Sequence, residues 1–142
     1  MSPDLQPGYQ FEWHYTVPAR ATVPQLYHDY LPCAPMPDVL ATGFMVGIME
    51  LACIESMMPF VDWPREQSLG TLVQFAHIAP TPPGMRLTIK VELVEIDGRR
   101  VRFAVQAWDE VEQICEGIHE RHMIDPEKFN AKLARKIGGA AQ

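Results

Sequence analysis

One carboxylate lies within the most apolar stretch of this chain. Residues 43–54, GFMVGIMELACI, are apolar except for Glu50. A helix that is apolar on all sides is normally buried, and an ionised carboxylate costs several kcal/mol to remove from water unless it is paired. Glu50 is therefore either a base or nucleophile activated by desolvation, or the structural partner of a buried arginine or histidine.

His77 is the residue best suited to act with Glu50. It lies in a predicted strand, residues 71–79, on an apolar face that it shares with Val73, Phe75 and Ala79. We expect this face to look at the helix, which would place His77 beside Glu50 and hold its ring in one tautomer for proton transfer. The alternative is a structural histidine.

Thr42 stands just before the apolar stretch, where a helix N-cap residue is expected. The free backbone N–H groups and the positive helix end beside an N-cap also suit a developing oxyanion, so the two roles can coexist. Thr42 and Glu50 are eight residues apart, which is about 12 Å along a helix. They cannot hydrogen-bond directly, so they either flank a substrate or meet groups from a second protomer.

A glycine and an arginine are further candidates for the same site. Gly70, in SLGT, is either a loop glycine at a strand start or a point where a backbone N–H approaches a carbonyl closely. Arg121 either neutralises Glu50, holds an anionic substrate group or forms a structural ion pair. It shares one face of a predicted strand with Cys115, Gly117, His119 and Met123. His119 and His122 point to opposite faces, which argues against a metal pair.

The surrounding sequence predicts the elements that position these residues. Alternation of apolar and polar residues indicates strands, the apolar stretch indicates a helix that stops before Pro59, and Asp-Gly at 97–98 indicates a hairpin. The predicted strands are residues 8–17, 71–79, 86–96, 99–110 and 113–124. The predicted helices are residues 43–58 and an amphipathic segment at 126–137, with a short helix or turn between the first strand and the long helix.

Short connections between the later strands predict an antiparallel sheet, and therefore the α+β class. One face of a flat sheet cannot cover a helix that is apolar on all sides. The sheet must curl around the helix, or a second subunit must cover it. This is the hotdog fold, a curved antiparallel sheet wrapped around a long central helix and usually paired as a dimer.

The composition is that of a folded, acidic protein. A length of 142 residues, 47% of them apolar, fits a single domain over residues 1–142, and a net charge of −6 disfavours nucleic-acid binding. The three cysteines lack CxxC spacing, which disfavours a disulfide framework or zinc site and favours a reducing cytoplasm. We expect no secretory signal and no membrane span, because the charge-free apolar stretch stops at Glu50.

Five blocks of sequence resemble the fluoroacetyl-CoA thioesterase family of hotdog proteins. They are ATGFMVGIMELACIESMMP, SLGT, GRR, GIHER and EKFNAKL, in the family's order over most of the chain. The resemblance implies hydrolysis of an acyl-CoA thioester by a homodimer, with Thr42, Glu50 and His77 as catalytic residues. It also implies that Gly70 lies near the thioester carbonyl and that Arg121 belongs to the site.

The segment that lids the acyl pocket departs from the family. Cys33 and Met36 stand where the fluoroacetate-resistance member carries phenylalanines, so we expect a fluoroacetyl-CoA-thioesterase-like enzyme acting on a short acyl-CoA. Arg99 and Arg100 are either solvated charges or contacts for the CoA phosphates. The expected products are a free acid and CoA, through direct water attack or an acyl-enzyme, without metal or redox cofactor. The alternatives are hydration of an enoyl thioester and binding of acyl-CoA without catalysis.

Overall fold

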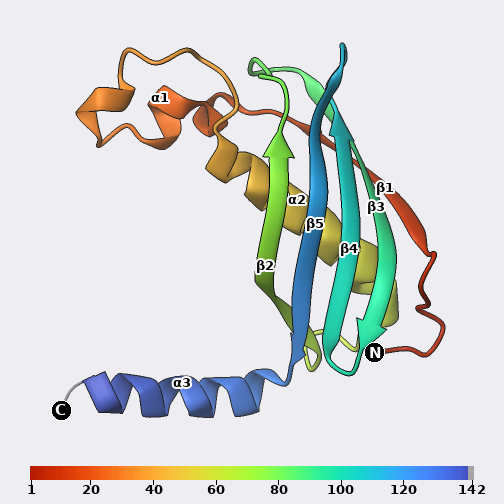
Figure 1. The fold of residues 1–142 in the computed structure, drawn as a ribbon. Coiled ribbons are helices and arrows are strands. Elements are labelled where there is room, and N and C mark those ends of the chain that lie inside the picture. The colour runs from red at the N-terminus through yellow and green to blue at the C-terminus, as the bar shows by residue number, and fades with distance from the viewer. Residues whose placement is uncertain (141–142) are drawn as a thin grey trace.

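The structure is a computed structural model that describes residues 1–140 (Figure 1). The strands are β1 (Gln10–Thr16), β2 (Gln67–His77), β3 (Arg86–Asp97), β4 (Arg100–Trp108) and β5 (Gln113–Ile124). The α-helices are α1 (Val23–Leu26), α2 (Thr42–Met57) and α3 (Pro126–Ala140). Three short 3-10 turns are η1 (Ala19–Ala21), η2 (Leu31–Cys33) and η3 (Met58–Phe60).

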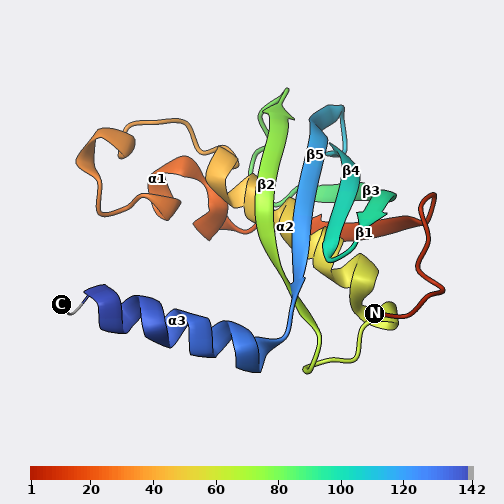
Figure 2. The same cartoon turned by 60° about the horizontal axis from the view of Figure 1, so that its bottom comes forward.

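The strands form one antiparallel sheet in the order β1-β3-β4-β5-β2, which curves around α2 (Figures 1 and 2). The two-residue hairpin between β3 and β4 turns at Gly98, whose φ of 60° is readily adopted by glycine. Alternate residues of β3 and β4 face the helix and are fully buried, namely Leu87, Ile89, Leu93, Val101, Phe103 and Ala107. The predicted α+β hotdog fold is confirmed.

The sheet covers only one side of α2. The covered side consists of fully buried residues, namely Met45, Ile48, Met49, Ala52 and Cys53. On the other side Leu51 is 44% exposed, and Val46, Gly47, Glu50 and Ile54 are half-buried. The segment Thr42–Phe60 is long and apolar enough to cross a bilayer, with a mean hydropathy of 1.4 over an 18-residue window. The core helix of a folded domain meets the same criteria of length and composition.

Two boundaries differ from those expected. The N-cap of α2 is Ala41, and Thr42 is the first helical residue, so the expectation that Thr42 caps the helix is wrong. Its hydroxyl is turned toward His77 instead of toward the helix N–H groups. β2 begins at Gln67, four residues before the predicted start, because Gly70 lies inside the strand at a register shift that interrupts the alternation.

Two segments project beyond β2, which is one edge of the sheet (Figures 1 and 2). Residues 19–40, which include α1, project from the end of β2 at which His77 lies. Helix α3 projects from the other end, where Gln67 pairs with Ile124. The predicted C-terminal helix is confirmed, and the Asp125 carboxylate caps it by accepting hydrogen bonds from the next backbone amides, at 3.0 and 3.4 Å.

Candidate active site

Thr42 and His77 meet where α2 begins and β2 ends. The Thr42 Oγ1 lies 2.9 Å from Nδ1 of His77. The other ring nitrogen, Nε2, is buried and has no hydrogen-bond partner among residues 1–140. Burial lowers the pKa of His77 below its ordinary value of 6.5, which keeps the ring neutral at pH 7 and able to accept a proton. A hydroxyl beside a neutral imidazole is a group that can be activated for attack.

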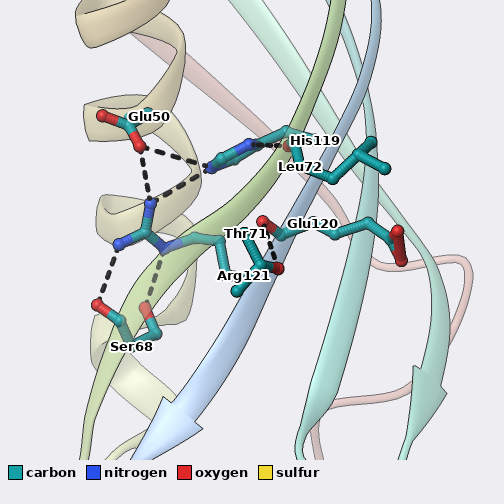
Figure 3. A network of polar contacts seen from close by, with 7 residues as sticks. All are labelled: Glu50, Ser68, Thr71, Leu72, His119, Glu120 and Arg121. Carbon is teal, nitrogen blue, oxygen red and sulfur yellow. Dashed lines mark hydrogen bonds and ion pairs between the residues drawn. The ribbon is translucent and has the colours of Figure 1, made fainter.

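Two turns further along α2, Glu50 faces Arg121 of β5 (Figure 3). The Glu50 Oε1 lies 3.5 Å from Arg121 Nη1, and Figure 3 shows the second carboxylate oxygen directed away from the cluster. The guanidinium is held by Ser68, whose hydroxyl and carbonyl oxygens accept from Nε and Nη2 at 2.8 Å each. Arg121 is buried, whereas the Glu50 side chain is 38% exposed. A fixed, buried cation therefore orients a carboxylate at the open side of the fold.

His119, which is fully buried, positions the guanidinium of Arg121. Its Nδ1 donates to the Leu72 carbonyl oxygen at 2.8 Å, which leaves Nε2 to accept from Arg121 Nη1 at 3.1 Å. Burial lowers the pKa of His119, in keeping with a neutral ring. The 4.0 Å approach of His119 Nε2 to Glu50 is therefore a contact of a neutral ring and not an ion pair.

Gly70 gives the Glu50 carboxylate its space. A Cβ atom at position 70 would lie 2.5 Å from Glu50 Oε1 and 3.1 Å from His119 Cε1. A side chain at position 70 would push the Glu50 carboxylate aside and press on the His119 ring, so glycine lets the backbone of β2 approach the carboxylate in its present position. The structure thus brings Gly70 and Arg121 to Glu50, and contact with Glu50 is one of the roles that the sequence left open for Arg121.

The structure separates His77 from Glu50 within one protomer. His77 contacts Thr42, whereas Glu50 contacts Arg121, and positions 42 and 50 are about 12 Å apart along α2. The expectation that His77 lies beside Glu50 is therefore wrong for a single chain. The physical reason is that β2 runs along α2, so that its last residue meets the start of the helix and Gly70 meets Glu50. Glu50 is also less buried than expected, because it lies on the uncovered side of α2.

Cys33 and Met36 lie in the projecting segment, residues 19–40. Cys33 is buried within it, and Met36 is 45% exposed. From the same segment, the Tyr27 hydroxyl lies 2.9 Å from where a Cβ of Gly43 would stand. The projecting segment therefore contacts α2 directly beside Thr42.

Two other groups are less suited to chemistry than their residue types suggest. Arg100 is paired with Glu120 at 2.7 Å and with Glu95 at 3.2 Å, so the structure favours an ion-pair role for it over a free contact for phosphate. Cys53 and Cys115 are buried free thiols, and burial raises the pKa of both, that of Cys115 to about 12. Neither is a thiolate at neutral pH.

A hollow of about 990 Å³ lies on the face of the sheet opposite α2. It is lined by both polar and apolar residues, among them Gln74, Lys90, Gln106, Glu116 and Ile118. None of the sequence-predicted site residues lines it. The two polar clusters instead lie along the seam between α2 and β2, at the edge of the sheet that the chain leaves uncovered.

His119 and Ser68 have no role in the sequence-based prediction of the site. A signal for His119 was present, since it is two residues from Arg121 in a strand and both point to the apolar face. Two polar side chains on a buried face need hydrogen-bond partners, and each is the nearest partner available to the other. Ser68 precedes the irregular part of β2 and carries no comparable signal.

Comparison with known proteins places this geometry in a family. Residues 25–127 match the family described as fluoroacetyl-CoA-specific thioesterase. The fluoroacetyl-CoA thioesterase of Streptantibioticus cattleyicolor is 44% identical over 136 residues, which cover 96% of this chain and 97% of that one. A solved structure of the fluoroacetyl-CoA thioesterase FlK has a TM-score of 0.88 at 45% identity, covering 93% of this chain and 97% of the other. A T42S mutant of FlK has been solved with acetyl-CoA.

The likeness extends beyond the family at the level of the fold. A hot-dog-like protein from Thermanaerovibrio acidaminovorans has a TM-score of 0.76 at 16% identity, over 95% of this chain and 93% of the other. The fold is that of the hotdog proteins of the thioesterase superfamily. The chain belongs to the fluoroacetyl-CoA-specific thioesterase family, which confirms the resemblance seen in the five sequence blocks.

Proposed function

We propose that this chain hydrolyses a short acyl-CoA to the free acid and CoA, as a homodimer in which two copies complete each active site. The observation that carries the proposal is that the Thr42–His77 pair and the Glu50–Arg121 cluster lie along one open seam. Family membership supports a thioester substrate, and the FlK mutant solved with acetyl-CoA supports a small acyl group. We assign the limit on acyl size to Cys33 and Met36.

Each cluster supplies a different part of thioester hydrolysis. Neutral His77 takes a proton from Thr42 or from water, and Glu50 accepts a proton or stabilises the imidazolium that forms. The Thr42 hydroxyl and the Gly70 amide orient the carbonyl oxygen and stabilise its developing charge. In direct attack the oxygen of water bonds to the acyl carbon, the carbon–sulfur bond breaks, and a proton passes to the sulfur of CoA. Through an acyl-enzyme, the Thr42 oxygen bonds to the acyl carbon as CoA leaves with that proton, and water then cleaves the ester to give the free acid and the Thr42 hydroxyl.

Two features of the β2 edge, and the contrast with the other edge of the sheet, support a second copy. β2 pairs with β5 on one side only, so the backbone groups on its other side are open. Leu51, Leu69 and Val73 are 44%, 41% and 43% exposed along this edge. The other edge strand, β1, exposes the polar residues Glu12 and His14 instead. An open edge flanked by apolar side chains is a surface suited to pairing.

A two-fold axis between Val73 and Gln74 of β2 would join the two clusters from different copies. Antiparallel pairing of two β2 strands sets the His77 end of one beside the Gly70 region of the other. The Thr42–His77 pair of one copy then approaches the Glu50 cluster of its partner. Symmetry would thereby close a gap of about 12 Å that the helix imposes within one chain.

Release of free thiol from a panel of short acyl-CoAs, including acetyl-CoA and fluoroacetyl-CoA, tests the proposal. We expect release by the natural chain and a loss of about 10²-fold or more in kcat/KM for Glu50→Gln and for His77→Ala. Glu55→Gln changes an exposed carboxylate on the same helix, and His122→Ala changes an exposed histidine on the outer face of β5. Both controls are expected to keep full activity.

The alternatives have distinct outcomes in the same assay. Tight binding of acyl-CoA without thiol release would contradict hydrolysis and favour a binding protein. Water addition to an enoyl-CoA without thiol release would favour a hydratase. Thiol release that is unchanged in both Glu50→Gln and His77→Ala would preserve the reaction and refute the site.

We also propose that the protein works in a reducing cytoplasm, without nucleic acid or membrane as a partner. The three cysteines are free and buried, which supports a compartment in which thiols stay reduced. The net charge of −6 disfavours attraction to polyanions. Fractionation of cells that express the tagged chain would test this, since recovery with the membrane fraction would contradict it.

A further inference from the structure

Helix α3 carries an apolar stripe that is not buried by the rest of the chain. Phe129, Leu133 and Ile137 recur at four-residue intervals on one side and are 36%, 42% and 63% exposed. No residue of α3 is buried within the described chain. A helix of 15 residues is marginal in water on its own and takes most of its stability from packing of its apolar side. The stripe is therefore a surface that suits a partner.

Helix α3 is basic, whereas the rest of the chain is acidic. α3 carries four cations and one anion, namely Lys128, Lys132, Arg135, Lys136 and Glu127, for a net charge of +3. The remaining residues therefore carry −9 within the total of −6. A basic helix is complementary in charge to an acidic surface, and the acidic remainder of a second copy of this chain is such a surface.

The sheet topology indicates where α3 would lie on a second copy. α3 follows Ile124, which pairs with Gln67 at the start of β2. Antiparallel pairing of two β2 strands brings the start of β2 in one copy beside the residues that follow His77 in the other. In that second copy the Ile78 amide donates to the Ile114 carbonyl, so Ile78 lies beside the start of β5. A helix of this length is about 22 Å long, enough to cross about four strands spaced about 4.8 Å apart.

The end of the sheet near Ile78 carries exposed apolar and acidic side chains, which complement the apolar stripe and the cations of α3. Ile78 is 52% exposed and Val111 is 74% exposed. The turn between β4 and β5 also holds three carboxylates, namely Asp109, Glu110 and Glu112. Within one chain this turn lies at the opposite end of the sheet from α3 (Figure 1), so α3 cannot reach it without a second copy.

We propose that α3 of each copy docks across the strand ends of the other, with its apolar stripe on Ile78 and Val111 and its cations beside the acidic turn, residues 109–112. The inference rests on the β2-edge dimer proposed above and extends that interface beyond the sheet. A lipid surface fits less well, because the stripe has three large side chains and the rest of the chain would be repelled by anionic lipid.

Charge reversal on the full chain tests the docking. The arm variant, Lys132→Glu with Arg135→Glu and Lys136→Glu, and the turn variant, Glu110→Lys with Glu112→Lys, are each expected to weaken the dimer about tenfold or more at low salt. Combining them in one chain is expected to restore the dimer Kd to within about threefold of the natural value. Asp109 is left unchanged because its carboxylate accepts hydrogen bonds from the Val111 and Glu112 amides within the turn. The Glu110 carboxylate accepts from the Arg86 amide at 2.9 Å, so Glu112→Lys alone is measured beside the turn variant. Sedimentation velocity over a dilution series gives the dimer Kd.

The matched control reverses two exposed carboxylates on the outer face of the sheet, Glu12→Lys with Glu92→Lys, and is expected not to rescue the arm variant. Failure of the turn variant to rescue it, or an arm variant with an unchanged dimer Kd, would overturn the docking and leave the β2-edge dimer standing. A natural chain that is monomeric would overturn both. The chain is also sedimented with phosphatidylcholine–phosphatidylserine vesicles. If the natural chain binds the vesicles, the arm variant does not, and the dimer Kd is the same for both, then α3 binds lipid and the docking is wrong. Thiol release is measured separately, so a lost reaction is distinguished from lost docking.

Discussion

The hydroxyl oxygen of Thr42 lies 2.9 Å from Nδ1 of His77, which ties the first residue of α2 to the last residue of β2. The same helix and strand meet a second time where Gly70 faces Glu50. These two contacts lie along one seam and are separated by two turns of helix. In the proposed mechanism each contact supplies only part of the hydrolytic site, and both lie along the edge that the single chain leaves uncovered.

The pH dependence of activity should report the burial of His77. Because burial lowers the pKa of His77 below 6.5, the ring stays neutral and able to accept a proton on mild acidification. We expect log kcat/KM to stay level down to pH 6.5 and to fall only at lower pH, where the ring becomes protonated. A fall in log kcat/KM that begins at or above pH 6.5 would contradict the buried position of His77 as the proton acceptor.

Stability should decline over the same range. The unfolded chain takes up protons on histidine near the ordinary pKa of 6.5, whereas folded His77 and His119 take them up only at lower pH. The free energy of unfolding is therefore highest above pH 6.5 and falls as the pH drops below it. Urea unfolding at about pH 7.5 and about pH 5.5 measures the decline. His119→Gln should reduce it, and the exposed control His122→Gln should not.

Gly70→Ala should disturb the site more than the fold. The added methyl group would stand 2.5 Å from Glu50 Oε1 and force the carboxylate out of place. We expect kcat to fall about 10²-fold, as for an ångström-scale misplacement of a reacting group. The control Gly138→Ala adds the same methyl group where nothing lies within 4 Å. Full activity in Gly70→Ala would show that the close approach has no catalytic role.

Arg121→Met should strongly destabilise the protein. The guanidinium is buried and bonds to Ser68 and His119 as well as Glu50, so its loss leaves polar groups without partners. We expect the free energy of unfolding to fall by about 3 kcal/mol or more. Arg102→Met, which removes a half-exposed cation 3.9 Å from Glu120, should cost less than about 1 kcal/mol. Equal losses in the two variants, measured by urea unfolding, would contradict the role of Arg121.

The fold could be predicted from sequence because its signals are local. Strict alternation marked β3, the Asp-Gly step marked the hairpin at Gly98, and the long apolar run, broken only by Glu50, marked α2. The start of β2 was missed because Gln67, Ser68 and the bulge at Gly70 lack alternation. Local pattern is informative only where the backbone is regular.

The partners of the site residues depend on how elements pack, which one sequence does not encode locally. Contact between Arg121 and Glu50 could be offered as one alternative because Arg121 shares a strand face with apolar residues, whereas the approach of Gly70 to Glu50 was not predicted. The pairing of His77 required the direction of β2 along α2, and that direction placed it beside Thr42. His119 was open to prediction from its spacing to Arg121, whereas Ser68 became a partner only through the backbone path before the bulge.

Mixing two inactive variants tests most directly whether each site draws on two copies. His77→Ala and Glu50→Gln chains are unfolded together, refolded and assayed for thiol release. If His77 of one copy works with Glu50 of the other, half of the sites in each mixed dimer are intact, and random pairing should restore about one quarter of the natural activity. A mixture that stays as inactive as the separate variants, while native mass spectrometry shows mixed dimers, would place both residues of each site in one chain and contradict the composite site.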